Sequence, residues 1–253
     1  MTNIRGGMAR INGVTFVSDC FIVTATRIKN GTIQIHTEKT LRRRGKKFRR
    51  LYDFMSETPF IRGIWNLLVM WFENWKILIA VFLLAAMVVL LSVFVFEERG
   101  AERINIPVWL LSHALFILLP KITPLGKYHA AEHQIVNAYE QGKNISLDNI
   151  KLASRVNRHC GTNLLVFIVS ITIILVTLLD INSLLAGLIG ISVGTEIHFN
   201  RNKVIEKVLV PFYILGSFLQ FYVFTSKANE EHLEVAIASW NELIRVDKEN
   251  SRL

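Results

Sequence analysis

The chain has 253 residues, of which 51% are hydrophobic, and its mean hydropathy is +0.37. Lysine and arginine number 29 against 20 acidic residues, which makes a formal net charge of +9. This composition excludes a disordered polar protein. The segment 77–96 carries no charge over 20 residues and, at about 1.5 Å per residue, matches the hydrocarbon core of a bilayer. We therefore expect an integral membrane protein.

All of the excess positive charge precedes this segment. Residues 1–76 hold 14 basic and 5 acidic residues, a difference of +9 that equals the net charge of the whole chain. Because positively charged flanks stay in the cytoplasm, the N-terminal region is predicted to be cytoplasmic, and its polar start argues against a cleavable signal peptide. Cys20 and Cys160 would then be reduced, and we expect no disulfide.

The residues from 8 to 40 are typical of a small β structure. The segments 21–28 and 32–38 are rich in β-branched residues or alternate in polarity, and Asn30-Gly31 between them is a strong hairpin-turn signal. Asn12-Gly13 predicts a turn between an earlier pair of strands. Residues 1–56 are therefore expected to form a β-hairpin module of three or four strands with a basic arm, a cap rather than a full domain.

Seven of the nine residues from 42 to 50 are basic. Such a cluster beside a membrane favours contact with anionic lipid headgroups. The alternatives are docking on a cytoplasmic partner such as a ribosome or translocon, and phosphate contacts to a nucleic acid. No residue of the cluster is suited to contact base edges, so sequence-specific nucleic-acid binding is not expected. The basic residues are Arg42, Arg43, Arg44, Lys46, Lys47, Arg49 and Arg50.

Residues 57–225 are predicted to form a membrane bundle. Thr58-Pro59 is typical of a helix start and leads into an apolar, tryptophan-containing helix at 60–72, which we expect to lie in the membrane interface. The loops between the apolar segments alternate between acidic and basic, which indicates four spans with both ends in the cytoplasm. The predicted spans are 77–96, 104–119, 164–179 and 184–199.

The C-terminal part contains a fifth apolar segment and an amphipathic tail. Segment 208–225 is interrupted by Pro211, Gly216 and Gln220, which favours a re-entrant or membrane-associated hairpin. Residues 226–253 are predicted to be cytoplasmic, with an apolar stripe at helical spacing over 229–246. The fold class is thus mainly α, with about four transmembrane helices, a re-entrant fifth segment and the N-terminal β module.

The loop 120–163 contains the motif His129-Ala130-Ala131-Glu132-His133. Two histidines at i and i+4 share one face of a helix, and H-x-x-E-H is the inverted zincin order, in which both histidines bind Zn²⁺ and the glutamate is the general base. We predict that His129 and His133 bind a divalent metal, with Zn²⁺ favoured, and that Glu132 is the catalytic base. Glu196, at the end of the fourth predicted span, is the predicted third ligand.

Several further residues are candidates for the surroundings of this site. His159 and Cys160 compete with Glu196 as ligands, whereas Tyr139 and Glu140 lie two turns beyond the histidines on a similar face. The alternative to a metal site is a structural polar network in which Glu132 pairs with Arg155. The helix that carries the motif is predicted to end at Gly142, and a second helix to run from 147 to about 158.

Taken together, several motifs resemble the YqhQ family of bacterial membrane proteins. They are Gly6-Gly7-x-Ala9 with Gly13-Val14, Tyr128-His129-x-Ala131-Glu132-His133, Tyr139-Glu140-x-Gly142, Ser154-Arg155, Cys160-Gly161-Thr162, Gln220 and Glu234-Val235-Ala236-Ile237. The resemblance implies a multi-pass inner-membrane protein, labelled a predicted metal-dependent enzyme, with His129, Glu132, His133, Cys160 and Glu196 in its polar core. Where the family pattern has His and Arg before Cys-Gly-Thr, this sequence has Asn157 and His159.

Two functions from different classes follow. The first is a metal-dependent hydrolase at the cytoplasmic edge of the membrane, acting on a membrane peptide or a lipid-linked molecule. The second is a non-catalytic scaffold or accessory factor of protein insertion, which docks through the basic arm.

Overall fold

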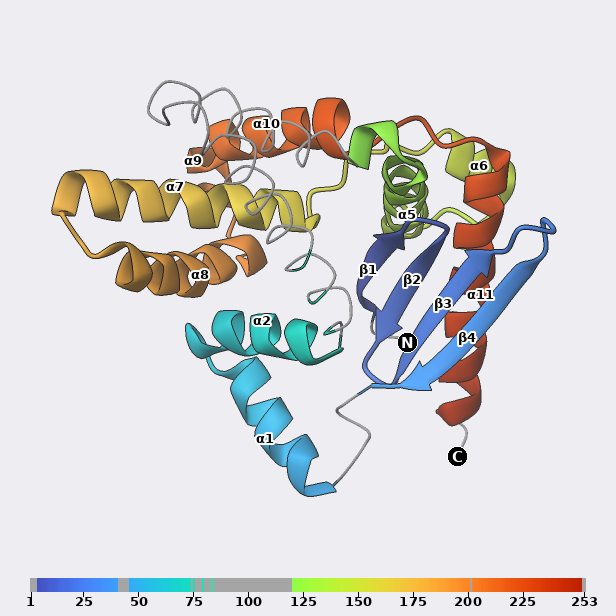
Figure 1. Ribbon diagram of the computed structural model, residues 1–253, viewed down its shortest axis with the longest axis horizontal. Helices are drawn as coiled ribbons and strands as arrows, with labels where there is room; N and C mark the ends of the chain where they lie inside the picture. The colour runs from blue at the N-terminus through green and yellow to red at the C-terminus, as the bar shows by residue number, and fades with distance from the viewer. Residues whose placement is uncertain are drawn as a thin grey trace, which may run out of the picture.

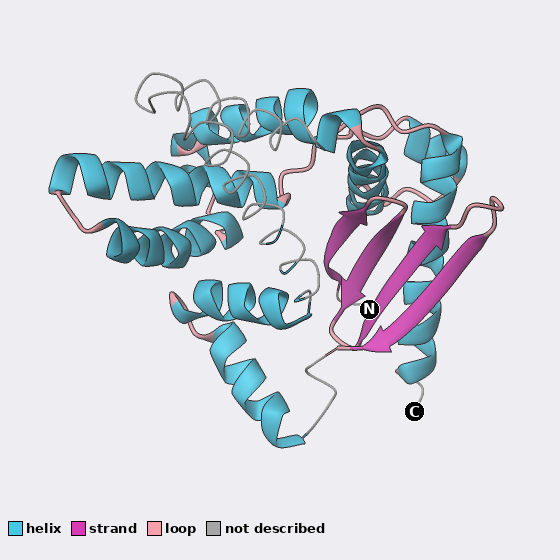
Figure 2. Cartoon of the chain, viewed as in Figure 1, coloured by secondary structure: helices cyan, strands magenta, loops and turns pink. Residues whose placement is uncertain are grey.

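The computed structural model describes residues 4–40, 46–73, 75, 79, 83, 120–200 and 202–251. The first two predicted spans, 77–96 and 104–119, lie outside the described residues except for helical residues 79 and 83. Arg42, Arg43 and Arg44 of the basic arm also lie outside them. The described part is mostly helical and has one N-terminal antiparallel sheet (Figure 2).

The sheet is an antiparallel meander in the order β1-β2-β3-β4. Its strands are β1 (Ile4–Arg10), β2 (Gly13–Ser18), β3 (Phe21–Arg27) and β4 (Ile33–Lys39). Both predicted turns are confirmed: Asn12 lies between β1 and β2, and Gly31 between β3 and β4 has a φ of 84°, which glycine adopts without a steric cost.

The sheet is part of the main hydrophobic core. The N-terminal module is therefore not the separate cap that the sequence predicted. Helix α11 (Glu230–Asn250) lies across one face of the sheet, and α5 (Pro124–Glu140) lies beside β1 and β2 (Figure 1). Phe16 is fully buried, with its ring edge-on to Trp240 at a centroid distance of 5.1 Å. The N-terminal module, the motif helix and the predicted C-terminal amphipathic helix therefore share one core.

The apolar half of the described chain is a helical hairpin with short helices beside it. Helix α7 (Gly161–Leu179) packs along α8 (Ser183–Phe199), and Gly190 lets the two backbones approach, because a Cβ there would lie 2.4 Å from Thr172 Oγ1. Among the described residues, α7 is the helix long and apolar enough to cross a membrane, and 22% of its most apolar window is buried. Four spans therefore stay a prediction.

The N-terminal approach to this hairpin consists of two helices. Helix α1 (Lys46–Glu57) contains the second half of the basic arm, and α2 (Ile61–Glu73) packs against α8. The helix predicted over 60–72 is confirmed as α2, although it begins at Ile61, because Phe60 has a left-handed φ of 65°.

The fifth apolar segment, 208–225, forms two helical pieces and follows a short helix. Helix α9 (Lys203–Val208) is followed by α10 (Val210–Leu219), which carries Pro211 in its first turn, where a missing N–H costs nothing. A π-helical turn, η3 (Gln220–Phe224), then leads out of the helix. Such turns widen the helix locally and re-aim backbone carbonyl groups.

The second helix of the 120–163 loop is shorter than predicted. Helix α6 (Leu147–Lys151) is capped by Ser146, whose hydroxyl oxygen accepts from the backbone N–H of Asn149, but it ends seven residues before the expected Arg158. Side-chain amides of α5 hold the following backbone instead: Asn137 Nδ2 donates to the carbonyls of Ser154 (2.7 Å) and Val156 (2.9 Å). These bonds replace the helical ones that the segment would otherwise make.

Candidate metal centre

The two histidines of the motif project from the middle of α5. The helix starts with Pro124 in its first turn and ends near Gly142, whose φ of 68° stops it as predicted. One helical turn separates His129 from His133, so their rings lie side by side with centroids 4.4 Å apart. The expectation that both share one face is therefore confirmed.

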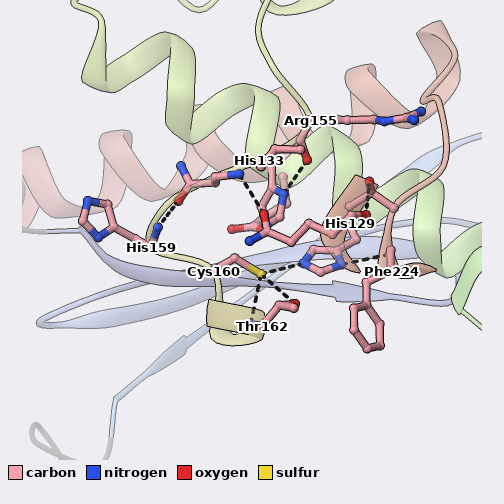
Figure 3. Close-up of polar contacts among 12 residues, drawn as sticks. His129, His133, Arg155, His159, Cys160, Thr162 and Phe224 are labelled. Carbon is pink, nitrogen blue, oxygen red and sulfur yellow. Dashed lines mark hydrogen bonds and ion pairs between the residues drawn. The ribbon is translucent and has the colours of Figure 1, made fainter. Parts of the chain in front are cut away.

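Cys160 completes a cluster with these histidines (Figure 3). One ligand atom from each of His129, His133 and Cys160 lies within 4.8 Å of the other two, and Cys160 Sγ is 3.5 Å from His129 Nε2. Cys160 lies 27 positions after His133 in the sequence and reaches the cluster because it is the N-cap residue of α7. Two imidazoles and one thiol thus converge on a single point.

Backbone carbonyl groups fix the orientation of both rings. His129 Nδ1 lies 3.2 Å from the carbonyl of Phe224, and His133 Nδ1 lies 2.7 Å from the carbonyl of Arg155. Because a carbonyl oxygen only accepts, each Nδ1 carries the hydrogen and each Nε2 keeps a free lone pair. This is the arrangement by which a metal-binding histidine is held in one tautomer.

Cys160 is similarly held by Thr162. The backbone N–H of Thr162 donates to Cys160 Sγ at 3.4 Å, and the thiol lies 3.4 Å from the Thr162 hydroxyl oxygen. Burial raises the pKa of the Cys160 thiol to about 11, with the nearby carboxyl of Glu132 acting in the same direction. Without a cation the sulfur is therefore a neutral thiol at neutral pH, and binding of a metal ion would displace its proton.

Glu132 lies at the edge of the cluster and is almost completely buried. Its Oε2 is 3.6 Å from His133 Nε2, and 8% of the residue is exposed. Burial raises the pKa of the Glu132 carboxyl to about 8, and burial together with His129 lowers the pKa of His133 to about 3. No lysine or arginine among the described residues pairs with this carboxyl. The cluster thus places neutral nitrogen donors beside an acid that lacks a counter-charge.

The structure does not contain the ion pair between Glu132 and Arg155 that a purely structural network would use. The Arg155 guanidinium lies over the Phe221 ring, with Cζ 3.8 Å from the centroid, and its Nη2 donates to the Phe221 carbonyl at 3.4 Å. Figure 3 shows this side chain directed away from the cluster. Arg155 therefore contacts His133 through its backbone carbonyl, and its guanidinium does not neutralise Glu132.

Glu196 is not brought to the two histidines. Arg62 Nε donates to its Oε1 at 2.8 Å, and the backbone N–H of Phe60 donates to the same oxygen at 2.9 Å. The carboxylate is satisfied by these donors where the end of α8 meets α2, so it joins two helices instead of completing the cluster. Cys160, the competing candidate in the sequence, occupies the place expected for Glu196.

The remaining candidates lie around the cluster without joining it. His159 Nε2 is 3.9 Å from Glu140 Oε1, and the His159 ring lies 6.4 Å from that of His198. The Tyr139 ring contacts that of Trp240 of α11 at a tilted angle, with a centroid distance of 4.9 Å. His159, Glu140 and Tyr139 therefore surround the end of α5, and none belongs to the set of three ligand atoms.

An amide network behind the cluster was not predicted as such. Asn157 is 3% exposed, and its Nδ2 donates to Asn137 Oδ1 at 2.7 Å, while its backbone N–H donates to Gln220 Oε1 at 2.9 Å. This network holds the segment that carries the Arg155 carbonyl and Cys160. Asn157, which replaces the histidine of the family pattern, is thus a structural residue here. Asn137, Asn157 and Gln220 are distant from one another in the sequence, so local patterns could not predict this network. Gln220 was singled out only as one of the motifs of the family resemblance.

Two arginines of the basic arm face solvent. Arg49 and Arg50 are exposed on α1, and Arg49 Nε lies 3.8 Å from Asp53 one turn later. Lys46 and Lys47 belong to the same helix.

The structure thus defines an α+β chain in which a sheet, the motif helix and the C-terminal helix hold a His₂Cys cluster at the start of an apolar hairpin. Residues 65–246, well over half of the chain, match the family described as "Protein of unknown function (DUF1385)", and the chain belongs to that family. Over 148 residues it is 31% identical to "Uncharacterized protein YqhQ" of Bacillus subtilis (strain 168), which confirms the resemblance to the YqhQ family. That match covers 54% of this chain and 46% of the relative, about half of its length. No solved structure matches the chain.

Proposed function

We propose that this protein is a metal-dependent hydrolase that works at a membrane surface, with Zn²⁺ held by His129, His133 and Cys160. The observation that carries the proposal is the convergence of one ligand atom from each of these three side chains within 4.8 Å of one another. The backbone contacts of both Nδ1 atoms support it, because they leave both Nε2 lone pairs free for a metal ion.

The chemistry of the donors fits a borderline-soft transition metal. Imidazole nitrogen and thiolate sulfur are the ligands that Zn²⁺ takes in proteins, whereas Mg²⁺ and Ca²⁺ prefer oxygen. The unpaired buried carboxyl of Glu132 points the same way, since a cation would supply the counter-charge that the described residues lack. Three protein ligands are the number typical of catalytic zinc sites, which keep one position open.

Glu132 is the proposed proton acceptor. Its Oε2 lies 3.6 Å from His133 Nε2, so in the metal-loaded protein this carboxylate would be placed to accept a proton from water beside that histidine. When bound, the metal ion supplies Lewis-acid activation of water and of the substrate carbonyl or phosphoryl group. His129 and His133 hold their tautomers through Phe224 and Arg155, so the site is organised before substrate arrives.

Two features support work at a membrane. Helix α7 starts directly after Cys160 and has the length and composition of a span, so the cluster would lie at the polar end of a membrane helix. Helix α1 exposes Phe48, Leu51 and Phe54 beside the basic Arg49 and Arg50, a pattern suited to an anionic membrane surface. A membrane peptide or a lipid-linked molecule is therefore the proposed substrate class, at the cytoplasmic face of an inner membrane.

Elemental analysis tests the proposal. Protein purified in detergent without a metal-binding tag is expected to hold about one zinc ion per chain, and the double variant His129→Ala/His133→Ala none, with both folded by circular dichroism. Glu132→Gln is expected to keep the metal and to lose hydrolysis of a peptide or lipid-linked substrate. Metal-free wild-type protein after purification with zinc present would reject the hydrolase and favour the non-catalytic scaffold, whose partners would be sought by cross-linking.

A further inference from the structure

A cleft lies away from the metal cluster, between the segment before α7 and the helices α9 and α10. It has a volume of about 640 Å³. The cluster residues His129, His133 and Cys160 do not line it. Six of the residues that form its walls are Val156, Arg158, Lys203, Lys207, Val210 and Tyr213.

The charged groups of this cleft are mainly basic. Arg158, Lys203 and Lys207 contribute three positive charges, and Glu206 contributes one negative charge, so the lining has a net charge of +2. Arg158 already pairs with Glu206, with Nη2 2.9 Å from Oε1. Lys203 and Lys207 have no acidic partner among the described residues, and at i and i+4 they share one face of α9. They are therefore available for an anion.

The uncharged part of the lining combines the apolar Val156 and Val210 and the Tyr213 ring with the polar Asn163 and Ser217, and apolar surface continues outside it. Val210 and Tyr213 form the wall on α10, and the Tyr213 ring lies under the Arg158 guanidinium, with Cζ 4.5 Å from the centroid. On the same helices Val204, Val208 and Ile214 are 70%, 72% and 64% exposed. An anion that carries hydrocarbon would satisfy both surfaces, whereas a small hydrophilic anion would satisfy the lysines alone.

We infer that this cleft binds the phosphate of an anionic phospholipid through Lys203 and Lys207, with the acyl chains along α9 and α10. The inference rests on the membrane location proposed above but is independent of hydrolysis. The position agrees with it, since Arg158 and Asn163 on the cleft wall flank the start of α7, where headgroups would meet a membrane helix.

Lipid binding to the full chain in detergent tests the inference. Phosphatidylglycerol and phosphatidylcholine are added separately, and retained lipid is measured by native mass spectrometry while the melting temperature is followed. We expect phosphatidylglycerol to bind about tenfold or more tightly than phosphatidylcholine. The double variant Lys203→Gln/Lys207→Gln is expected to lose that preference. The matched control is Lys29→Gln/Lys143→Gln, which removes two exposed lysines outside the cleft and is expected to keep it.

Three results would overturn the inference. They are equal affinity for the two lipids, an unchanged preference in the cleft variant, and an equal loss in the control. Inorganic phosphate is tested in the same way. If phosphate stabilises the wild type as much as phosphatidylglycerol does and competes with it, the cleft is a site for free phosphate and the lipid assignment is wrong. Zinc content measured on the same samples separates failure here from failure of the hydrolase, because the variants leave His129, His133 and Cys160 unchanged.

Discussion

The backbone of Gly7 in strand β1 lies directly against the carboxyl group of Glu132 in helix α5. A Cβ added at Gly7 would be 2.4 Å from Glu132 Oε1 and 2.8 Å from its Cδ, closer than non-bonded atoms approach. The neighbouring Gly6 has nothing within 4 Å of the same position. The N-terminal sheet thus forms one wall of the metal cluster, and Gly7 sets where the proposed proton acceptor lies.

This contact predicts opposite results for two adjacent substitutions. Gly7→Ala is expected to displace Glu132, lowering hydrolysis strongly and stability by about 1–3 kcal/mol, the usual cost of overfilling a packed site. Gly6→Ala is expected to change either quantity little. Thermal unfolding and zinc content of both variants check the prediction, and equal behaviour of the two would mean that the close approach at Gly7 does not constrain the site.

Replacing Cys160 is predicted to weaken the metal centre. Cys160→Ser exchanges a sulfur ligand for a poorer oxygen donor, so the affinity for Zn²⁺ should fall about tenfold or more. The matched control is Cys20→Ser, because Cys20 is the other cysteine and lies away from the cluster, near Asn250. Competition with a chromogenic chelator measures the affinity. Wild-type affinity in Cys160→Ser would remove the sulfur from the ligand set.

Glu196 is expected to matter for stability and not for metal binding. Glu196→Gln removes the ion pair with Arg62 that joins α8 to α2, and we expect a loss of about 1–2 kcal/mol, scaled down from a buried pair because both side chains are partly exposed. Zinc content should stay at the wild-type level. Glu249→Gln, which breaks an exposed pair with Arg245, is the control and should cost less. Loss of zinc in Glu196→Gln would restore the role predicted from the sequence.

The stability of the protein is predicted to fall in mild acid through His232. This residue is 8% exposed under the ring of Tyr128, and its pKa is lowered, first by burial and then by the charges of Lys127 and Arg27, with Glu231 opposing them. A histidine whose folded pKa is lowered binds protons more readily when unfolded, so its contribution is present at neutral pH and is lost as the pH falls below about 6.5.

Thermal unfolding at pH 7.5 and pH 5.5 tests this prediction. The wild type should lose more stability between the two pH values than His232→Gln, which has no group to titrate at this position. His36→Gln, which removes an exposed histidine from β4, controls for the loss of a histidine as such. The same pH dependence in the wild type and His232→Gln would contradict the assignment.

Local signals in the sequence were sufficient for most elements. The turn at Gly31, the start of α5 at Pro124 and its end near Gly142 depend on the backbone conformations that glycine and proline favour. These preferences are local, so no distant contact is needed to predict them. The shared face of His129 and His133 follows from helical periodicity alone. The motif and the elements that carry it were therefore predictable.

Tertiary structure alone decided which residues complete the site. Cys160 and Glu196 were both candidates, and the choice depends on the paths of α7 and α8: the first starts at the cluster, whereas the second ends beside Arg62. The contact of Gly7 with Glu132 joins a strand to a helix more than a hundred residues away. Periodicity and propensity act over a few residues, so the two histidines and their helix were predictable from the sequence. Contacts such as that of Gly7 arise when the sheet and α11 bury a common core, and this packing placed Cys160 as the third donor.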